Sequence, residues 1–167
     1  MSETGHGRGA EPMQDGDGGV GHDPSDCIFC RILVGDAPGT FVYRDEICAA
    51  LMDIQPVNPG HVLVIPIEHA SYLADLDEEI AGRLMRIGHR LSGALRRSGL
   101  RCEGTNMFLA DGEAAMQDVF HVHLHVFPRF RGDGFGLRLG PEYENKPTRE
   151  ALEDAGQRVR VALGRRG

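Results

Sequence analysis

Hydrophobic and polar residues alternate most regularly over residues 121–127, where the chain reads His-Val-His-Leu-His-Val-Phe. An alternation with a period of two is typical of a half-buried β-strand, because successive side chains on a strand point to opposite faces. His121, His123 and His125 would then share one face, and the apolar residues between them would pack into a core. Each imidazole carries a donor and an acceptor that must be satisfied when the ring is buried. Three of them on one strand face therefore indicate a functional site.

Shorter apolar runs predict four further strands. They cover residues 41–43, 47–51, 62–65 and 106–109, and turn-forming residues such as Asn58, Pro59 and Gly60 stand between them. The short turns favour antiparallel pairing between neighbouring strands.

A helical period follows the third of these runs. Apolar residues recur at a spacing of three or four and form one stripe: Leu76, Ile80, Leu84, Ile87, Leu91 and Leu95. Asp75 or Asp77 can cap the start of this helix, and Gly99 can close its end. Residues 149–163 predict a second, terminal helix. Together the elements predict an α+β fold, an antiparallel sheet of about five strands with one long helix and a C-terminal helix.

The first 26 residues differ in composition from the rest of the chain. They hold seven glycines and six acidic residues but few large apolar ones, so burial cannot offset their ordering entropy. We therefore expect a disordered tail over residues 1–26 and one folded domain with a C-terminal extension over residues 27–167.

Charge and hydropathy limit the kinds of molecule that the protein is expected to bind. The 167 residues carry a formal net charge of −7, and 41% of them are hydrophobic, which is typical of a globular protein. The chain has no dense Lys/Arg stripe, which argues against a nucleic-acid partner. It has no apolar run long enough to span a membrane and no signal-peptide pattern at its start, so we expect a cytoplasmic protein.

Four cysteines without a secretory signal are expected to be reduced thiols or metal ligands. Cys27 and Cys30 have the C-x-x-C spacing that either chelates zinc or forms a redox dithiol. The glycine-rich segment before them favours a metal, because a redox pair normally sits between a strand and a long helix. Two thiolates need two more ligands, and the candidates are His69 and one end of the histidine strand.

The three alternating histidines admit three chemistries. All three rings could bind one catalytic zinc ion, or one ring could act as a nucleophile and form a covalent phosphoramidate. In the third chemistry, one ring binds a metal ion and another acts as the nucleophile. The spacing alone does not choose among them. Backbone N–H groups of the turn at residues 112–117 could meet a phosphate, whereas the glycine-rich run 132–136 is interpreted as a flexible loop without a catalytic role.

These motifs together resemble the histidine triad (HIT) superfamily of nucleotide hydrolases and transferases. The resemblance rests on motifs that occur in family order: Cys27-Ile28-Phe29-Cys30, Asp53-Ile54, the run Gly60 to Pro66, Gln117 and the triad His121-x-His123-x-His125. It covers residues 27–140 and is closest to the Hint-like branch, including the bacterial members that carry a zinc site.

The resemblance implies catalytic roles for four residues. His123 would attack the α-phosphorus of a nucleoside phosphate, and a covalent nucleotidyl-histidine would form. His125 would donate to a phosphate oxygen, and His61 would support the triad from the neighbouring strand. Gln117 would orient the leaving group or the attacking water.

The resemblance also implies residues for the nucleotide and for a metal. Asp53 would accept hydrogen bonds from the ribose hydroxyls, and Asp118 would lie near the leaving group. The base would rest in an apolar slot made by Ile28, Phe29, Ile32, Leu51 and Ile54. A closed, structural zinc ion would be held by Cys27, Cys30, His69 and His121.

Three residues near the expected phosphate depart from the family pattern. Ala110 stands where Asn is frequent, Met116 where Gly is usual, and Asp118 where a Ser or Thr would hydrogen-bond near the leaving group. An ionised carboxylate there would repel phosphate, whereas a protonated one could act as a general acid.

The expected function is that of a homodimeric hydrolase or nucleotidyl transferase that acts on nucleoside 5′-phosphate derivatives. Phosphoramidates, adenylylated compounds and dinucleoside polyphosphates are the expected substrates. The alternatives are a nucleotide-binding interaction module with little turnover and a zinc hydrolase with all three triad histidines on the metal.

Overall fold

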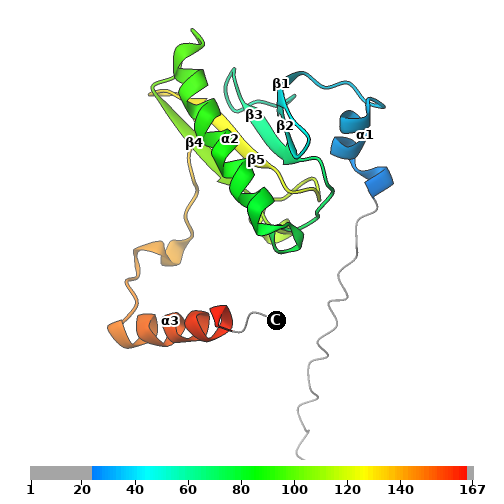
Figure 1. Cartoon of the computed structure of the whole chain (residues 1–167). Coiled ribbons are helices and arrows are strands. Elements are labelled where there is room, and N and C mark those ends of the chain that lie inside the picture. The colour runs from blue at the N-terminus through cyan, green and yellow to red at the C-terminus, as the bar shows by residue number, and fades with distance from the viewer. Residues whose placement is uncertain (1–23, 165–167) are drawn as a thin grey trace, which may run out of the picture. The chain divides into compact units, whose positions relative to one another are not determined.

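The computed structural model describes residues 24–164. Its first part contains a five-stranded antiparallel sheet with the strand order β1-β2-β3-β5-β4 (Figure 1). The strands are β1 (Phe41–Arg44), β2 (Cys48–Met52), β3 (Val62–Pro66), β4 (Gly104–Leu109) and β5 (Leu124–Arg129). The helices of this part are α1 (Ile28–Val34) and α2 (Glu78–Arg97), with short 3-10 turns at Pro24–Asp26, Leu73–Asp75 and Glu113–Ala115. The predicted α+β architecture is confirmed.

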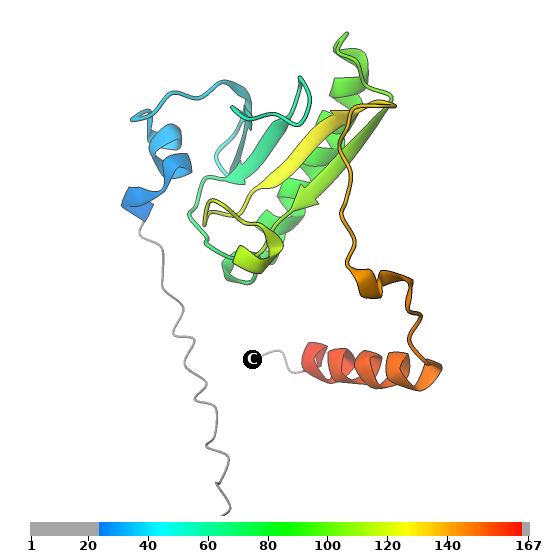
Figure 2. The same cartoon turned by 180° about the vertical axis from the view of Figure 1, so that it is seen from behind.

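Helix α2 covers one face of the sheet: Figure 1 shows the helix in front of the strands, and Figure 2 shows the strands from the opposite side. Asp77 caps its start, because the side-chain Oδ1 accepts from the backbone N–H of Glu79 at 2.8 Å and of Ile80 at 3.4 Å. The predicted apolar stripe of α2 packs against alternate side chains of β2, β3 and β5. This contact forms the larger of two hydrophobic cores.

Helix α1 packs against the other face of the sheet. Its apolar side chains form a second buried cluster with alternate residues of β2 and β3, among them Leu51 and Leu63. Leu63 pairs in register with His125 of β5, which puts His125 on the same face as α1. The hydrophobic pattern did not predict α1, because its seven residues are too few for a helical period to stand out.

Strand β5 begins at Leu124, three residues later than the alternation over residues 121–127 suggests. His121 and His123 lie in the segment before the strand, where the N–H of Val122 bonds to the carbonyl of Ala70 at 2.8 Å. The ladder between β3 and β5 stops at the pair of Val64 with Leu124. Pro66 ends β3 nearby, and a proline cannot donate to a further ladder bond.

Residues 134–164 belong to a second unit of the chain. It contains a 3-10 turn at Pro141–Glu144 and helix α3 (Arg149–Leu163), which spans the predicted residues. Thr148 caps α3 by accepting from the N–H of Ala151 at 3.2 Å, and no side chain of this helix is buried. Within residues 24–164, no helix is both long enough and apolar enough to cross a membrane.

The tail expected over residues 1–26 lies almost entirely outside the described residues. Its last three residues, Pro24–Asp26, form the first 3-10 turn, and the carbonyl of Pro24 accepts from the N–H of Cys27 at 3.2 Å.

Candidate active site and metal centre

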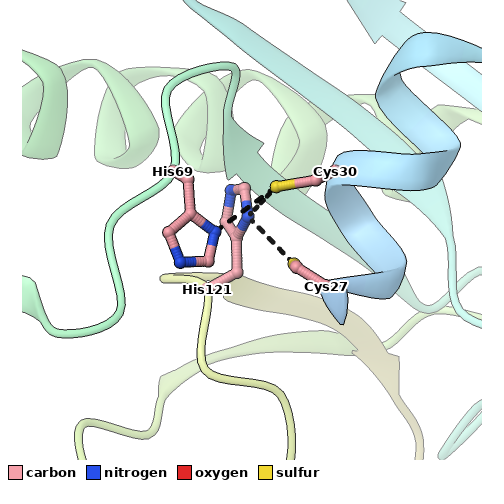
Figure 3. Close-up of side chains that lie close together, drawn as sticks. All are labelled: Cys27, Cys30, His69 and His121. Atoms are coloured by element: carbon pink, nitrogen blue, oxygen red, sulfur yellow. Dashed lines mark hydrogen bonds between the residues drawn. The ribbon is translucent and has the colours of Figure 1, made fainter. Parts of the chain in front are cut away.

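Four side chains with metal-binding atoms meet between α1 and the histidine segment (Figure 3). Cys27 directly precedes α1 and Cys30 lies in its first turn. His69 comes from the loop after β3, and His121 from the segment before β5. The ligand atoms of these four residues all lie within 4.8 Å of one another. The structure therefore brings together the four residues that the resemblance implies for zinc.

The distances between these atoms match a tetrahedral zinc site. Nδ1 of His121 lies 3.5 Å from Sγ of Cys27 and 3.6 Å from Sγ of Cys30, and Nδ1 of His69 lies 3.3 Å from Sγ of Cys30. Zinc binds sulfur at about 2.3 Å and nitrogen at about 2.0–2.1 Å, so tetrahedral sulfur and nitrogen ligands are about 3.6 Å apart. These three distances fit a tetrahedral zinc site, and four protein ligands would leave no coordination position for water.

Neighbouring groups orient the two histidines of this cluster. The Nε2–H of His121 donates to the carbonyl of Pro66 at 3.0 Å, which leaves the lone pair on Nδ1 directed at the thiols. Nε2 of His69 lies 3.4 Å from the hydroxyl of Ser71. Burial lowers the pKa of His121 to about 4, so the ring is neutral, as a metal ligand must be. Sequence reasoning gave Pro66 and Ser71 no role in orienting these rings, although both lie within three residues of His69.

His123 presents a ring nitrogen that is free to react. Its Nδ1–H donates to the carbonyl of His121 at 2.7 Å, so Nε2 keeps a lone pair. Burial lowers the pKa of His123 and favours the neutral ring. Among residues 24–164, the one fully buried side-chain nitrogen or oxygen without a hydrogen-bond partner is Nε of Arg83. Nε2 of His123 has no partner either, so it is not fully buried and a substrate can reach it. A neutral imidazole of this kind is a nucleophile near neutral pH.

His61 and His125 form a hydrogen-bonded pair beside this nucleophile. The backbone N–H of Val57 donates to Nδ1 of His61 at 3.1 Å, so the proton of His61 lies on Nε2. That Nε2–H donates to Nδ1 of His125 at 3.0 Å, which leaves the proton of His125 on its own Nε2. The ring centroids of His123 and His125 are 4.8 Å apart. Adjacent rings thus offer a lone pair and an N–H donor.

Burial sets the charge of this pair. It lowers the pKa of His61, and it lowers the pKa of His125 to about 4, with the neighbouring His123 and His61 rings adding to the effect on His125. Both rings are therefore neutral near pH 7, which agrees with the single proton that the hydrogen bonds assign to each.

Asp53 forms a second group of possible metal ligands with His61 and His125. Its Oδ2 lies 3.3 Å from Nδ1 of His61 and 4.0 Å from Nδ1 of His125. Both of these ring nitrogens already accept hydrogen bonds, from Val57 and from His61. A metal ion would have to break this chain, so the geometry favours a hydrogen-bonded network over a second metal centre.

The three triad rings do not converge on one point. Nδ1 of His121 faces the thiols, Nδ1 of His123 bonds to a carbonyl, and Nδ1 of His125 bonds to His61. No group of possible metal ligands within the described part of the chain contains all three. The geometry does not support the alternative of one zinc ion bound by the whole triad.

Gln117 is buried, and its amide bonds to the backbone. Nε2 donates to the carbonyls of Ser71 at 2.8 Å and Val119 at 3.2 Å, and Oε1 accepts from the N–H of Gly112 at 2.7 Å. These bonds hold the loop of residues 112–119 in place. In this conformation the backbone uses both amide hydrogens and one acceptor position of the amide oxygen.

The three residues that depart from the family pattern differ in their surroundings. Asp118 is exposed, and its charge opposes the lowering of the pKa of His123 and His125 by burial. Met116 has a φ of 69°, the one positive φ of a non-glycine residue among residues 24–164. That left-handed conformation is the physical reason why glycine suits this position. Ala110 is buried.

The five apolar residues expected around a base do not form one exposed surface. Phe29, Ile32 and Leu51 are buried in the core beside α1, whereas Ile28 is 40% exposed and Ile54 is 94% exposed. The ring of Phe29 meets the rings of His121 and His123 edge-on, with centroids 5.8 and 5.3 Å apart. Phe29 therefore packs against the triad and does not present an open face to a base.

Comparison with known proteins identifies the family. The HIT domain model matches residues 34–132. The chain is 39% identical over 137 residues to an uncharacterized HIT-like protein of Mycobacterium tuberculosis, an alignment that covers 82% of this chain and 92% of that protein. It is 32% identical over 134 residues to adenosine 5′-monophosphoramidase of Schizosaccharomyces pombe, covering 80% and 95% of the two chains.

A solved structure is similar as well. The chain matches a Zn-bound histidine triad family protein from Mycobacterium smegmatis with a TM-score of 0.65 and 39% identity, covering 85% of this chain and 96% of that chain. The chain therefore belongs to the HIT domain family, and the resemblance inferred from its motifs is confirmed.

Proposed function

We propose that this HIT-family protein hydrolyses nucleoside 5′-phosphate derivatives through a covalent nucleotidyl-histidine. The observation that carries the proposal is the state of His123: the carbonyl of His121 holds the proton on Nδ1, and the lone pair of Nε2 is accessible. The similarity to the monophosphoramidase of S. pombe supports adenosine phosphoramidate as the first substrate to test.

In the first step, Nε2 of His123 attacks the α-phosphorus. A nitrogen–phosphorus bond forms, the bond to the leaving group breaks, and the leaving group takes a proton from solvent. His125 donates its Nε2–H to a non-bridging phosphate oxygen, where negative charge builds in the transition state. In the second step, water attacks the phosphorus and releases a proton to solvent, the phosphorus–nitrogen bond breaks, and its electron pair returns to His123. Adenosine phosphoramidate would yield AMP and ammonia.

We also propose that Cys27, Cys30, His69 and His121 hold a structural zinc ion, which the Zn-bound relative from M. smegmatis supports. A bound metal would tie α1 and the loop after β3 to the segment that carries the nucleophile. His121 has a part in both sites, because its ring belongs to the ligand set and its carbonyl holds the proton of His123.

For the nucleotide, we propose Asp53 as the acceptor for the ribose hydroxyls and Ile28 and Ile54 as the apolar contacts of the base. Phe29, Ile32 and Leu51 would form the buried floor beneath them. The exposed carboxylate of Asp118 would lie near the phosphate and weaken its binding, because like charges repel.

We further propose that the protein is a homodimer that pairs through β4. Strand β4 has six residues and lies at an edge of the sheet, where β5 is its one neighbour among the described residues. The other edge strand, β1, has four residues and an irregular register with β2, which makes it a poorer template for pairing. Light scattering of the purified protein tests this proposal, with Met107→Lys in β4, at a side chain that is 36% exposed, as the variant expected to disrupt the pairing. A monomeric wild-type protein would contradict it.

The proposed chemistry is tested by trapping the intermediate. Zinc-loaded protein is mixed with adenosine phosphoramidate, diadenosine polyphosphates or their guanosine counterparts, quenched in alkali, and analysed by peptide mass spectrometry. We expect a nucleotidyl adduct on His123, none in His123→Asn, and full turnover in the matched control His89→Asn, whose side chain is exposed on α2.

Two results would decide for other functions. Turnover in the His123→Asn variant would exclude the covalent route through this ring. Tight nucleotide binding without turnover in the wild-type protein would favour the nucleotide-binding module, for which the departures from the family pattern at Ala110, Met116 and Asp118 are the supporting observations.

A further inference from the structure

The glycine-rich run 132–136, which composition marks as a flexible loop, contains a buried carboxylate. The side chain of Asp133 is 3% exposed. Its Oδ2 accepts from Nε of Arg129 at 2.6 Å and from Nδ2 of Asn58 at 2.9 Å, and its Oδ1 accepts from a terminal nitrogen of Arg129 at 2.8 Å. A buried carboxylate with charge-assisted bonds of this kind is held firmly in place.

Asn58 connects this carboxylate to the loop between β2 and β3. Its amide uses both hydrogens, because Nδ2 donates to Asp133 and to the carbonyl of Pro128, each at 2.9 Å. Asn58 is 6% exposed, and its backbone carbonyl accepts from the N–H of His61 at 3.1 Å. Arg129, Asp133 and Asn58, here called the loop clamp, thus attach the end of β5 to the loop that leads into His61.

The same loop carries the group that decides the tautomer of His61. Two groups compete for Nδ1 of His61: the N–H of Val57 at 3.1 Å, which can only donate, and the carboxylate of Asp53 at 3.3 Å, which accepts when ionised. Val57 directly precedes Asn58, so its N–H keeps its direction while Asn58 is anchored. If Val57 moves away, a proton on Nδ1 that bonds to Asp53 becomes the better arrangement.

We propose that Asp133 is a positioning residue for the active site, which acts through Asn58 and Val57 to keep the proton of His61 on Nε2. The consequence for catalysis rests on the proposed role of His125 as a donor. In the opposite tautomer, Nε2 of His61 accepts, and the proton of His125 moves to Nδ1. His125 would then turn a lone pair toward the phosphate and repel the charge it should stabilise.

The first test is Asp133→Asn in the full-length, zinc-loaded protein. The substitution keeps the size of the side chain but removes its charge and one of its two acceptor oxygens, so the three hydrogen bonds that Arg129 and Asn58 donate to it cannot all form. In ring-nitrogen NMR spectra we expect His61 to shift from Nε2–H toward Nδ1–H. With adenosine phosphoramidate, kcat should fall at least about tenfold while KM stays within about twofold, because no residue proposed to contact the nucleotide is changed.

Asn58→Ala is the second variant and breaks the same chain at its next link. The double variant should lose no more kcat than the worse single variant, because the two residues act through one contact. This pair also keeps the proposal testable if one of the single variants does not fold.

The matched control is Asp45→Asn. Asp45 is also paired with an arginine, since it accepts from Arg83 at 2.6 Å and from the hydroxyl of Tyr43 at 2.5 Å, but none of these bonds reaches residues 53–60. We expect this variant to lose stability and to keep both the His61 tautomer and kcat. If kcat falls equally in Asp133→Asn and Asp45→Asn, the loop clamp has only a structural role.

The proposal is overturned if folded Asp133→Asn or Asn58→Ala protein shows the wild-type tautomer of His61. If the wild-type protein turns over no nucleotide, only the proposed function is lost. The NMR comparison then still decides the role of Asp133: a reversed tautomer supports the proposal, and an unchanged one refutes it.

Discussion

Zinc binding should release about two protons per ion, and about one in the Cys30→Ser variant. A cysteine binds zinc as the thiolate and not as the thiol, so each ligating thiol must give up its proton. Burial raises the pKa of the Cys30 thiol to about 11, so this group is protonated in the metal-free protein at pH 7. The ring of His121 contributes no proton, because burial lowers its pKa to about 4 and it is already neutral.

The proton count sets the pH dependence of metal binding. Protons compete with zinc for the thiols, so affinity falls as the pH falls. Near neutral pH, two released protons correspond to a loss of about a hundredfold per pH unit in the wild-type protein, and one proton to about tenfold in Cys30→Ser. The variant should also unfold at a lower temperature, because the binding energy of a structural metal is folding energy.

Calorimetric titration of metal-free protein with zinc measures this count directly. The observed enthalpy is plotted against the ionisation enthalpy of several buffers, and the slope is the number of protons released. The control is Cys102→Ser, because the half-buried Cys102 lies outside the cluster and donates to the carbonyl of Gly104 at 3.2 Å, as a serine hydroxyl can. A wild-type count of zero, or equal counts in wild type and Cys30→Ser, would refute the assignment of the ligands.

Four further outcomes are expected. His123→Asn should bind nucleotide normally while kcat falls by about 1,000-fold or more, and near-normal kcat would exclude it as the nucleophile. Asp118→Ser should lower KM by up to about tenfold through reduced charge repulsion, and an unchanged KM would mean that the carboxylate does not face the phosphate. Met116→Gly should raise the free energy of unfolding in denaturant by about 1 kcal/mol, because it relieves the left-handed conformation, and a lower value would contradict that strain. Burial lowers the pKa of His125 to about 4, so between pH 6.5 and 4 this residue binds more protons in the unfolded chain, and its contribution to stability, at most about 3 kcal/mol, should be lost as the pH falls. His125→Asn should flatten this dependence, and His89→Asn should not.

The sheet and its long helix followed from the sequence because their signals are local. The alternation of apolar and polar residues has the period of a strand, and the stripe from Leu76 to Leu95 has the period of a helix. The predicted ranges agree with β1 to β4 and α2 to within a few residues, and α3 begins and ends where expected. The predicted start of β5 at residue 121 was wrong, because pairing beyond Leu124 depends on Pro66, a residue of another strand.

The sequence predicted which residues make up the candidate site, but not which ring nitrogens of its histidines carry the protons. The motifs and the family resemblance named Cys27, Cys30, His69 and His121, and the structure brings their ligand atoms within 4.8 Å of one another. No motif indicates that the carbonyl of His121 holds the proton of His123, or that the N–H of Val57 holds the lone pair of His61. Almost any residue type supplies the same backbone N–H and carbonyl, so the sequence does not reveal these contacts.

The sequence by itself determined the secondary structure of the sheet, because it depends on residue types at short, regular spacings, and its motifs named the candidate nucleophile and the candidate metal ligands through the family resemblance. Only the tertiary structure decided that Asp133 is buried against Asn58, 75 residues earlier in the chain. Composition described the run around Asp133 as a glycine-rich loop, since glycines are common in flexible segments. A charge-assisted contact between two distant segments has no period and no local pattern, so the folded chain alone reveals it.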